Sequence, residues 1–262
     1  MGRKILAGHA VLVYAFLYLP IAIVVGYAFN GGRQTLNWEG FSTRWFAEAL
    51  RDDTITGALK NSLVIAAGNA VVACVLGTML ALALPSLWRV IRIPLDALVT
   101  MTLVTPEIVF GIAALVFFSQ VGIALGLKTI LIAHVVFNAS VVALIVRARF
   151  VGMGKSLEEA SYDLGAGPLS TFRQVTLPRL APAIVAGGLL AFTFSFDDFY
   201  TSFFVSGAGT STLPLFIFSS LRFGVSPVVN ALAVMILALT IVASVVAYLV
   251  LRRSGQRTLP GL

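Results

Sequence analysis

Six long runs of apolar residues dominate this chain of 262 residues and restrict what it can fold into. A helix needs about 20 apolar residues to cross the hydrocarbon core of a bilayer, and each run is close to that length. We therefore expect an all-α polytopic membrane protein, a single domain over residues 1–262, with six transmembrane helices. The expected spans are residues 8–29, 62–84, 95–118, 129–147, 183–205 and 229–251.

Composition supports a membrane protein over a soluble one. Charged residues make up 11% of the chain and apolar ones 59%, whereas a soluble domain carries about 25% charged residues. The single cysteine, Cys74, lies in the second run, so we expect no disulfide within the chain and no cysteine-based metal site.

The first apolar run follows Arg3 and Lys4, so a secretory signal peptide is the alternative interpretation, with Gly26 and Ala28 resembling a cleavage site. The apolar core of a signal peptide is usually about 7–15 residues long. This run is longer, and we expect it to stay as a membrane helix.

Basic residues in the short loops predict the orientation, because cytoplasmic loops carry an excess of Lys and Arg. With six spans and both termini in the cytoplasm, the outer side holds six of the 18 basic residues and the cytoplasmic side holds the other twelve. Both termini are therefore expected to be cytoplasmic. The net charge of +7 reflects this topology and does not indicate a nucleic-acid partner.

Enzyme motifs are weak in this chain. A Gly-Lys-Ser at residues 154–156 resembles the end of a phosphate-binding loop, but Arg149 stands where the pattern requires glycine. Ser195 lies near Asp197, yet no histidine of the same run could act as its base. His134 is more simply explained by an interhelical hydrogen bond, together with Asn138 one turn later.

The polar segment between the fourth and fifth runs has clear helix signals. Ser156 and Glu159 form a capping-box pattern, and Gly165 suits the end of a short helix over 156–165. Pro168 can open a second short helix that continues to Leu177. We expect Pro178 and Pro182 to end that helix and start the fifth span.

The same segment, "EASYDLGAGPLSTFRQVTLP", resembles the EAA loop of ABC importer permeases, which reads Glu-Ala-Ala, three residues, Gly, nine residues, Ile, one residue, Leu-Pro. Ser161 and Val175 depart mildly from that pattern. The resemblance implies that the loop at residues 150–182, between helices 4 and 5, is a cytoplasmic coupling element for a partner ATPase that binds ATP and Mg. This chain would then need no cofactor. The matching positions are Glu159, Ala160, Ser161, Gly165, Val175, Leu177 and Pro178.

The resemblance extends over most of the chain. The stretches at 105–118, 122–127 and 195–233 are similar to the second permease subunit of spermidine/putrescine importers. Related permeases carry ferric ion, opines or aminoethylphosphonate, and these substrates remain alternatives. The resemblance implies a location in the bacterial inner membrane. It also implies a heterodimer with a second permease, two ATPase subunits and an extracytoplasmic substrate-binding protein.

Acidic residues inside the apolar runs indicate the substrate. Asp197, Asp198 and Glu107 lie within expected spans, where a charge costs about 2.5–3.5 kcal/mol on insertion scales and normally faces a cavity or a partner. No Lys or Arg lies mid-span to pair with them, which favours a cationic substrate such as a polyamine. One of the aspartates could instead cap a broken helix, and Glu107 follows a proline that bends the third span. Tyr200 or Phe196 could stack on an ammonium group, although packing is the alternative for both.

Two further interpretations stay open. Trp38, Trp45 and Phe46 are either interfacial anchors or part of a docking surface for a binding protein, and residues 215–223 are too short to span and should lie across the outer face. A secondary transporter would show an internal repeat and a relay of titratable groups, and no convincing repeat is present in the sequence.

Overall fold

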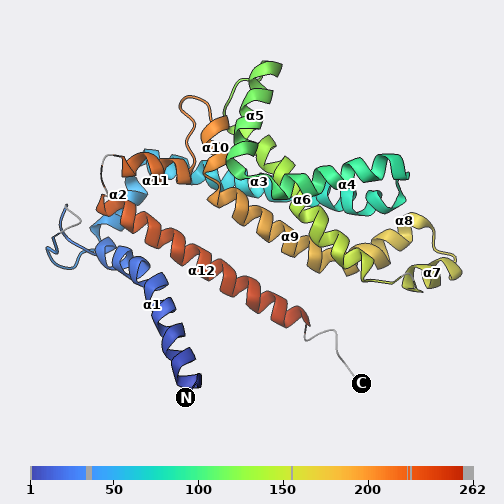
Figure 1. The fold of residues 1–262 in the computed structure, drawn as a ribbon, viewed down its shortest axis with the longest axis horizontal. Helices are drawn as coiled ribbons and strands as arrows, with labels where there is room; N and C mark the ends of the chain where they lie inside the picture. The colour runs from blue at the N-terminus through green and yellow to red at the C-terminus, as the bar shows by residue number, and fades with distance from the viewer. Residues whose placement is uncertain (1, 34–36, 155, 223, 225, 256–262) are drawn as a thin grey trace. The chain divides into compact units, whose positions relative to one another are not determined.

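The computed structural model describes residues 2–33, 37–154, 156–222, 224 and 226–255, and helices make up most of this part (Figure 1). The chain divides into two compact units. Unit 1 comprises residues Met1–Thr56 and Ile217–Leu262, and unit 2 comprises Gly57–Phe216.

Unit 1 is built on two long helices, α1 (Gly2–Ala28) and α12 (Pro227–Gly255), which pack on each other near the short helix α2 (Arg44–Arg51). Its small buried cluster consists of Ala28, Trp45 and Ala231. The indole nitrogen of Trp45 donates a hydrogen bond of 2.7 Å to the carbonyl of Asn30. Trp45 is therefore a packing residue of unit 1, whereas Trp38 is exposed.

Unit 2 holds the remaining helices, apart from the first turn of α3 and the second half of α11, which belong to unit 1. Short turns at Leu84–Ser86 and Phe172–Thr176 follow α3 and α8. The helices are α3 (Asp53–Ala83), α4 (Arg89–Val104), α5 (Glu107–Val121), α6 (Leu127–Val151), α7 (Ser156–Asp163), α8 (Pro168–Thr171), α9 (Leu177–Asp197), α10 (Tyr200–Val205) and α11 (Leu213–Leu221).

The core of unit 2 lies where α6 runs beside α9 and packs against α3 (Figure 1). Small residues allow these helices to approach closely. A Cβ on Gly77 would lie 2.7 Å from both the Ala139 carbonyl oxygen and the Val142 Cβ, and one on Gly188 would lie 2.7 Å from the Cys74 sulfur. Membrane helices commonly associate through such small residues, because packing replaces the missing hydrophobic drive.

Four described helices are long and apolar enough to cross a membrane, and a bent pair, α4 with α5, makes a fifth candidate. These four lie in the first, second, fourth and fifth predicted runs, at Leu6–Ala28, Asp53–Ser86, Leu127–Val151 and Pro168–Asp197. The prediction of an all-helical chain with several spans is confirmed in this coarser form. The last predicted run lies in α12, which is 29 residues long.

The third predicted span, 95–118, is not continuous. The chain turns by 117° between α4 and α5, with Thr105 in an extended conformation at φ −64° and ψ 128°. Pro106 causes this break, because its ring disfavours the helical conformation for the residue before it. The sequence correctly placed the bend at the proline and underestimated its size.

The fifth predicted span, 183–205, needs two corrections. It begins earlier, since α8, a π-helical turn and α9 form one helix from Pro168 to Asp197. Pro178 does not end the preceding helix. Pro178 has no N–H to donate to the carbonyl four residues earlier. The wider π-helical turn over Phe172–Thr176 accommodates this missing bond, and within it the N–H of Leu177 donates to the carbonyl of Phe172. The span also stops at Asp197, before α10 begins at Tyr200.

The predicted short helix of the polar segment is present as α7, which starts at Ser156 and ends two residues before the predicted boundary. Lys155, the residue before it, lies outside the described residues, so the proposed cap at Ser156 stays a prediction. Gly165 has φ +83° and donates to the Tyr162 carbonyl at 2.9 Å, while Ala166 donates to the Ser161 carbonyl at 3.1 Å. This bond pair is the Schellman motif, which favours glycine because its central residue is left-handed.

Candidate functional site: a polar pocket at two helix breaks

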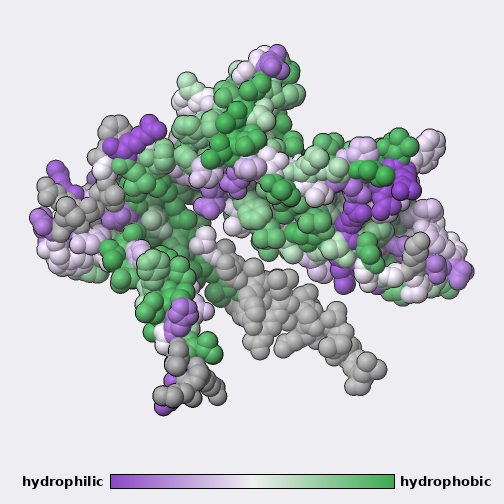
Figure 2. Space-filling model, viewed as in Figure 1, coloured by the Kyte–Doolittle hydropathy of each residue, from purple (hydrophilic) through white to green (hydrophobic). Residues whose placement is uncertain are grey.

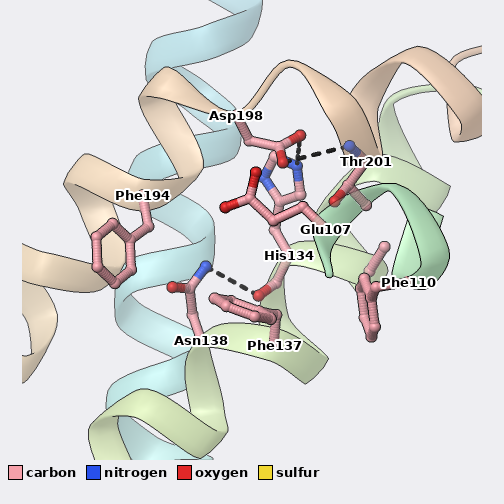
Figure 3. A pocket seen from close by; sticks show the side chains of 9 residues that line it. Glu107, Phe110, His134, Phe137, Asn138, Phe194, Asp198 and Thr201 are labelled. Atoms are coloured by element: carbon pink, nitrogen blue, oxygen red, sulfur yellow. Dashed lines mark hydrogen bonds and ion pairs between the residues drawn. The ribbon is translucent and has the colours of Figure 1, made fainter. Parts of the chain in front are cut away.

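A pocket in unit 2 lies where both helix breaks come together. About 350 Å³ of space free of protein atoms lies between its walls, including open solvent at its mouth. Its walls come from the start of α5, the middle of α6, the last turns of α9 and the start of α10 (Figure 3). The lining residues are Glu107, Phe110, Ala133, His134, Phe137, Asn138, Phe194, Asp198 and Thr201.

Gly111 brings α5 close enough to α10 to form this wall. A Cβ at Gly111 would lie 2.9 Å from a ring carbon of Phe204 and 3.3 Å from the Cα of Thr201. Glu107 is one helical turn before Gly111, in the first turn after the Pro106 break. The close packing of α5 and α10 thus places the Glu107 carboxylate beside the second break at Asp198.

Asp198 holds the break between α9 and α10 in place. Its backbone is extended, at φ −65° and ψ 120°, and its carboxylate accepts from the backbone N–H of Ser202 at 2.7 Å and of Thr201 at 3.3 Å. These are N–H groups of the first turn of α10, which have no partner inside that helix. The alternative that one aspartate caps a broken helix therefore describes Asp198.

His134 completes this network and changes two predictions. Its Nε2 lies 3.0 Å from the Asp198 carboxylate and its Nδ1 lies 2.7 Å from the Ser195 hydroxyl. Because a carboxylate only accepts, Nε2 carries a proton, and Nδ1 of the neutral ring can accept from Ser195. The expected interhelical role of His134 is confirmed, whereas Asn138 bonds within its own helix, donating to the His134 carbonyl at 3.0 Å. The sequence suggested that Asp198 has no partner, but its carboxylate bonds to His134 and to two backbone N–H groups.

The run that contains Ser195 has no histidine, as the sequence shows, but the fold brings His134 of another helix next to it. Ser195, His134 and Asp198 resemble a hydrolase triad in residue type. However, Ser195 is 5% exposed and is not among the residues lining the pocket, so a substrate in the pocket does not reach its hydroxyl. Asp198 is also engaged with two backbone N–H groups. The chain of bonds holds α6 against the α9–α10 break.

Two hydrogen-bond acceptors of the residues lining the pocket have no partner among the described residues. Within the described part of the chain, Glu107 forms no hydrogen bond or ion pair, and the side-chain oxygen of Asn138 is buried without a partner. Figure 3 shows the Glu107 carboxylate in the space bordered by Asp198, Phe194 and Asn138. The pocket can therefore accept hydrogen bonds from a ligand, and no Lys or Arg is among its lining residues.

The other predicted path residues lie outside this pocket. Asp197 is exposed, although it is the chain neighbour of Asp198. Phe196 is 8% exposed and stacks on Phe192, with ring centroids 6.0 Å apart. Tyr200 is exposed and contacts Phe199 edge to face. In this structure the pocket aromatics are Phe110, Phe137 and Phe194, and a role for Asp197, Phe196 or Tyr200 in transport stays a prediction.

The predicted coupling segment forms a second polar region, at α7 and α8. Its internal frame consists of a hydrogen bond of 3.0 Å between the Ser161 and Thr171 hydroxyls and one of 2.6 Å from Thr176 to the Glu158 carboxylate. Glu159 and Ala160 are exposed, as are Leu177 and Pro178 at the start of α9, and Val175 is half-buried. No atom of the described residues lies within 4 Å of a Cβ built at Gly165. Its left-handed backbone is the feature that requires glycine.

Apolar side chains on this polar region point to solvent. Leu164 is 89% exposed and Leu169 is 69% exposed. Figure 2 shows hydrophilic residues gathered at the end of unit 2 that carries α4, α7 and α8, whereas the middle of the unit is mostly hydrophobic. These leucines therefore stand out from their polar neighbours.

Sequence reasoning missed three participating residues. His134 and Asn138 were recognised as polar residues of a span, but their contacts with the pocket were not predicted. Glu158 was passed over in favour of its neighbour Glu159. A buried histidine and asparagine one turn apart, facing a second span with acids, was the available signal, since intramembrane polar groups usually face partners or cavities.

Residues 73–259 match the family described as binding-protein-dependent transport system inner membrane component. The chain is 42% identical over 254 residues to the putrescine transport system permease protein PotI of Escherichia coli K12, covering 94% of this chain and 90% of that protein. It is 36% identical over 253 residues to the spermidine/putrescine transport system permease protein PotC of the same strain, covering 96% of each. The PotC protein of Haemophilus influenzae is 37% identical over 245 residues, covering 94% of this chain and 95% of that protein.

Solved structures share the fold. A crystal structure of a bacterial ABC transporter involved in the import of alginate, an acidic polysaccharide, superposes with a TM-score of 0.77 at 14% identity, covering 96% of this chain and 94% of that one. An inward-facing structure of the MetNI methionine ABC transporter gives a TM-score of 0.61 at 18% identity, covering 76% and 95%. At such identities the likeness concerns the fold alone.

Proposed function

Because this chain belongs to the family of inner membrane components of binding-protein-dependent transport systems, we propose that it is the permease subunit of an ATP-driven importer for polyamines such as putrescine and spermidine. In this proposal the chain forms half of a translocation path and hydrolyses nothing itself. The relatives named for putrescine and spermidine/putrescine transport are 36–42% identical over nearly the whole chain.

The observation that carries the substrate class is the chemistry of the pocket in unit 2. Glu107 and Asp198 supply carboxylates, Asn138 supplies a free carbonyl oxygen, and aromatic rings complete the wall. An ammonium group donates hydrogen bonds and is attracted to carboxylates and to the faces of aromatic rings. An anionic aminoethylphosphonate would bring its phosphonate next to the unpaired Glu107, which disfavours that alternative.

Topology and partners form the second part of the proposal. Six spans would consist of α1, α3, the bent pair α4–α5, α6, α9 with α10, and α12, with both termini in the cytoplasm. The excess of basic residues in the loops on that side supports this orientation. The chain would pair with a different permease of the same family and receive substrate from an extracytoplasmic binding protein.

The loop at residues 150–182 would dock on a cytoplasmic ATPase that binds ATP and Mg. Support comes from the exposed leucines of this polar segment, because a partner that covers them removes apolar surface from water, which is favourable. The hydrogen bonds that join α7 to α8 and to the start of α9 would make the loop stiff enough to pass a movement of the ATPase to α9.

Uptake by cells that express the complete transporter tests this function. Labelled putrescine and spermidine should accumulate, and the uptake should stop when ATP is depleted. Unlabelled aminoethylphosphonate, an opine or ferric citrate should not compete. Competition by one of these compounds, without polyamine uptake, would keep the permease and replace its substrate.

A further inference from the structure

We infer that Asn138 and Glu107 together bind one ammonium group of the substrate, and that Asp198 positions the site instead of binding the substrate. This inference rests on the proposed function and assigns its recognition to particular atoms. Some polar groups of the pocket already have hydrogen-bond partners in the protein, and others have none among the described residues.

The orientation of the Asn138 amide follows from its neighbour. One end of the amide lies 3.0 Å from the His134 backbone carbonyl oxygen. A carbonyl oxygen can only accept a hydrogen bond, so the end that faces it must be the NH2 group. The amide oxygen then faces away from that carbonyl and is buried without a partner, in a residue that lines the pocket.

Asn138 is 2% exposed, so its oxygen is not satisfied by bulk water. A buried polar group without a hydrogen bond costs about 1–3 kcal/mol, and such a group in a native fold calls for an explanation. A donor that enters the pocket supplies one. The Glu107 carboxylate lines the same pocket and has no partner among the described residues, so a positively charged donor is the ligand chemistry that suits both groups.

The surrounding rings narrow the ligand to a cation with an apolar stem. Phe137 and Phe194 line the same space as the two acceptors (Figure 3). Aromatic faces attract cations and also cover methylene groups. A primary ammonium group on an alkyl chain combines three donors with such a stem, and a linear diamine presents this group at each end.

Asp198 differs, because its carboxylate already accepts several hydrogen bonds from the protein. Its carboxylate receives hydrogen bonds from two backbone N–H groups and from His134. These bonds use most of its acceptor positions and hold α10 against α6. Its contribution to the ammonium site is therefore to place the start of α10, with Thr201, at the pocket wall.

Asn69 offers a matched control for Asn138. It is also fully buried, its side-chain nitrogen donates to the Ala191 carbonyl at 2.8 Å, and its oxygen is likewise without a partner. However, Asn69 does not line the pocket. Replacing either residue by leucine removes a buried amide from the core of unit 2, and only one replacement changes the proposed ammonium site.

The experiment measures ATP-driven putrescine uptake by the complete transporter in proteoliposomes, at saturating binding protein and per assembled complex. We expect Asn138→Leu to lower uptake per assembled complex about tenfold or more, since a hydrogen bond to a charged group is lost, and Asn69→Leu to lower it far less, because Asn69 does not line the pocket. Adding Glu107→Gln to Asn138→Leu should lower uptake little further, because groups that bind one ligand atom are not additive.

Equal uptake in the Asn138→Leu and Asn69→Leu transporters would overturn the assignment, as would a double variant whose loss equals the product of the single losses. If the Asn138→Leu transporter does not assemble, the test uses Glu107→Gln and Glu107→Asp instead. Glu107 is exposed and forms no bond among the described residues, so these variants should fold. Full uptake by Glu107→Gln would then refute the site. Lack of ATP-dependent putrescine uptake by the wild type would refute the proposed function, and this inference with it.

Discussion

The pocket of unit 2 buries polar side chains, whereas the segment α7–α8 exposes apolar ones. In the pocket, polar groups such as His134 and Asn138 are buried in the middle of an apolar helix bundle. In the segment, Leu164 and Leu169 are exposed among polar residues. Each arrangement costs free energy in the isolated chain, because buried polar groups need partners and exposed apolar ones prefer to lose water.

The two regions differ in how much of this cost the chain itself removes. The His134 and Asp198 network is satisfied internally, so most of the pocket is a rigid frame with two open acceptors. The exposed leucines have no such partner within the described residues of the segment. Within the described residues, the polar groups of the pocket frame bond to one another, whereas Leu164 and Leu169 of the segment stay exposed, as the proposed docking on an ATPase requires.

The strongest way to break this comparison is to remove Asp198. Asp198→Leu leaves His134 and two N–H groups of α10 without their acceptor, and breaking such a buried charged network costs about 3–5 kcal/mol. The neighbouring variant Asp197→Leu changes an exposed side chain and should cost within about 0.5 kcal/mol. Thermal unfolding of the purified transporter measures both. Similar midpoints for the two variants would show that Asp198 is not a framework residue.

A substitution at Gly165 tests the segment without touching the pocket. Gly165→Leu forces a side chain onto a left-handed backbone at φ +83°, a strain of about 1–2 kcal/mol, and should distort the end of α7. We expect polyamine uptake to fall about tenfold or more while the protein remains in the membrane and ATP hydrolysis loses its coupling to uptake.

Gly167 is the control for this variant, because its backbone is extended at φ −74° and ψ 165° and nothing lies within 4 Å of a Cβ there. Gly167→Leu should transport within about twofold of the wild type. Normal transport by Gly165→Leu would mean that this end of α7 does not take part in docking.

The smallest expected effect concerns the internal frame of the segment. Ser161→Ala removes the hydrogen bond to Thr171, which is worth about 0.5–1.5 kcal/mol. Amide hydrogen exchange in α7 should accelerate accordingly. Ser170→Ala removes an exposed hydrogen bond to Gln174 and should leave amide exchange in α7 unchanged. Equal acceleration by both variants would show that the Ser161–Thr171 hydrogen bond does not stabilise α7.

Part of this structure could be predicted from residue patterns alone. Apolar runs placed the long helices, Pro106 placed the bend between α4 and α5, and Gly165 placed the end of α7. These features depend on local backbone chemistry, which neighbouring residues determine. The family resemblance came from the spacing of the polar segment, and the family match confirms it.

The break at Asp198 could not be predicted in the same way. No glycine or proline lies between residues 189 and 206, so the local sequence reads as a continuous helix. The break exists because the Asp198 side chain caps α10 and bonds to His134, which is 64 residues earlier. Contacts between residues so far apart in the chain depend on tertiary packing. For the same reason, the sequence did not show that the Asn138 oxygen has no hydrogen-bond partner.

The charge of Glu107 decides whether a cation passes through this pocket, because this carboxylate is the one acid among the lining residues with no bond to the protein among the described residues. The measurement is ATP-driven uptake of labelled putrescine by proteoliposomes that contain the complete transporter, carrying wild-type Glu107, Glu107→Asp or Glu107→Gln. We expect uptake by the aspartate variant to keep a substantial fraction of the wild-type value and uptake by the glutamine variant to fall about tenfold or more. Equal uptake by the glutamine variant and the wild type would contradict a cation path through this pocket.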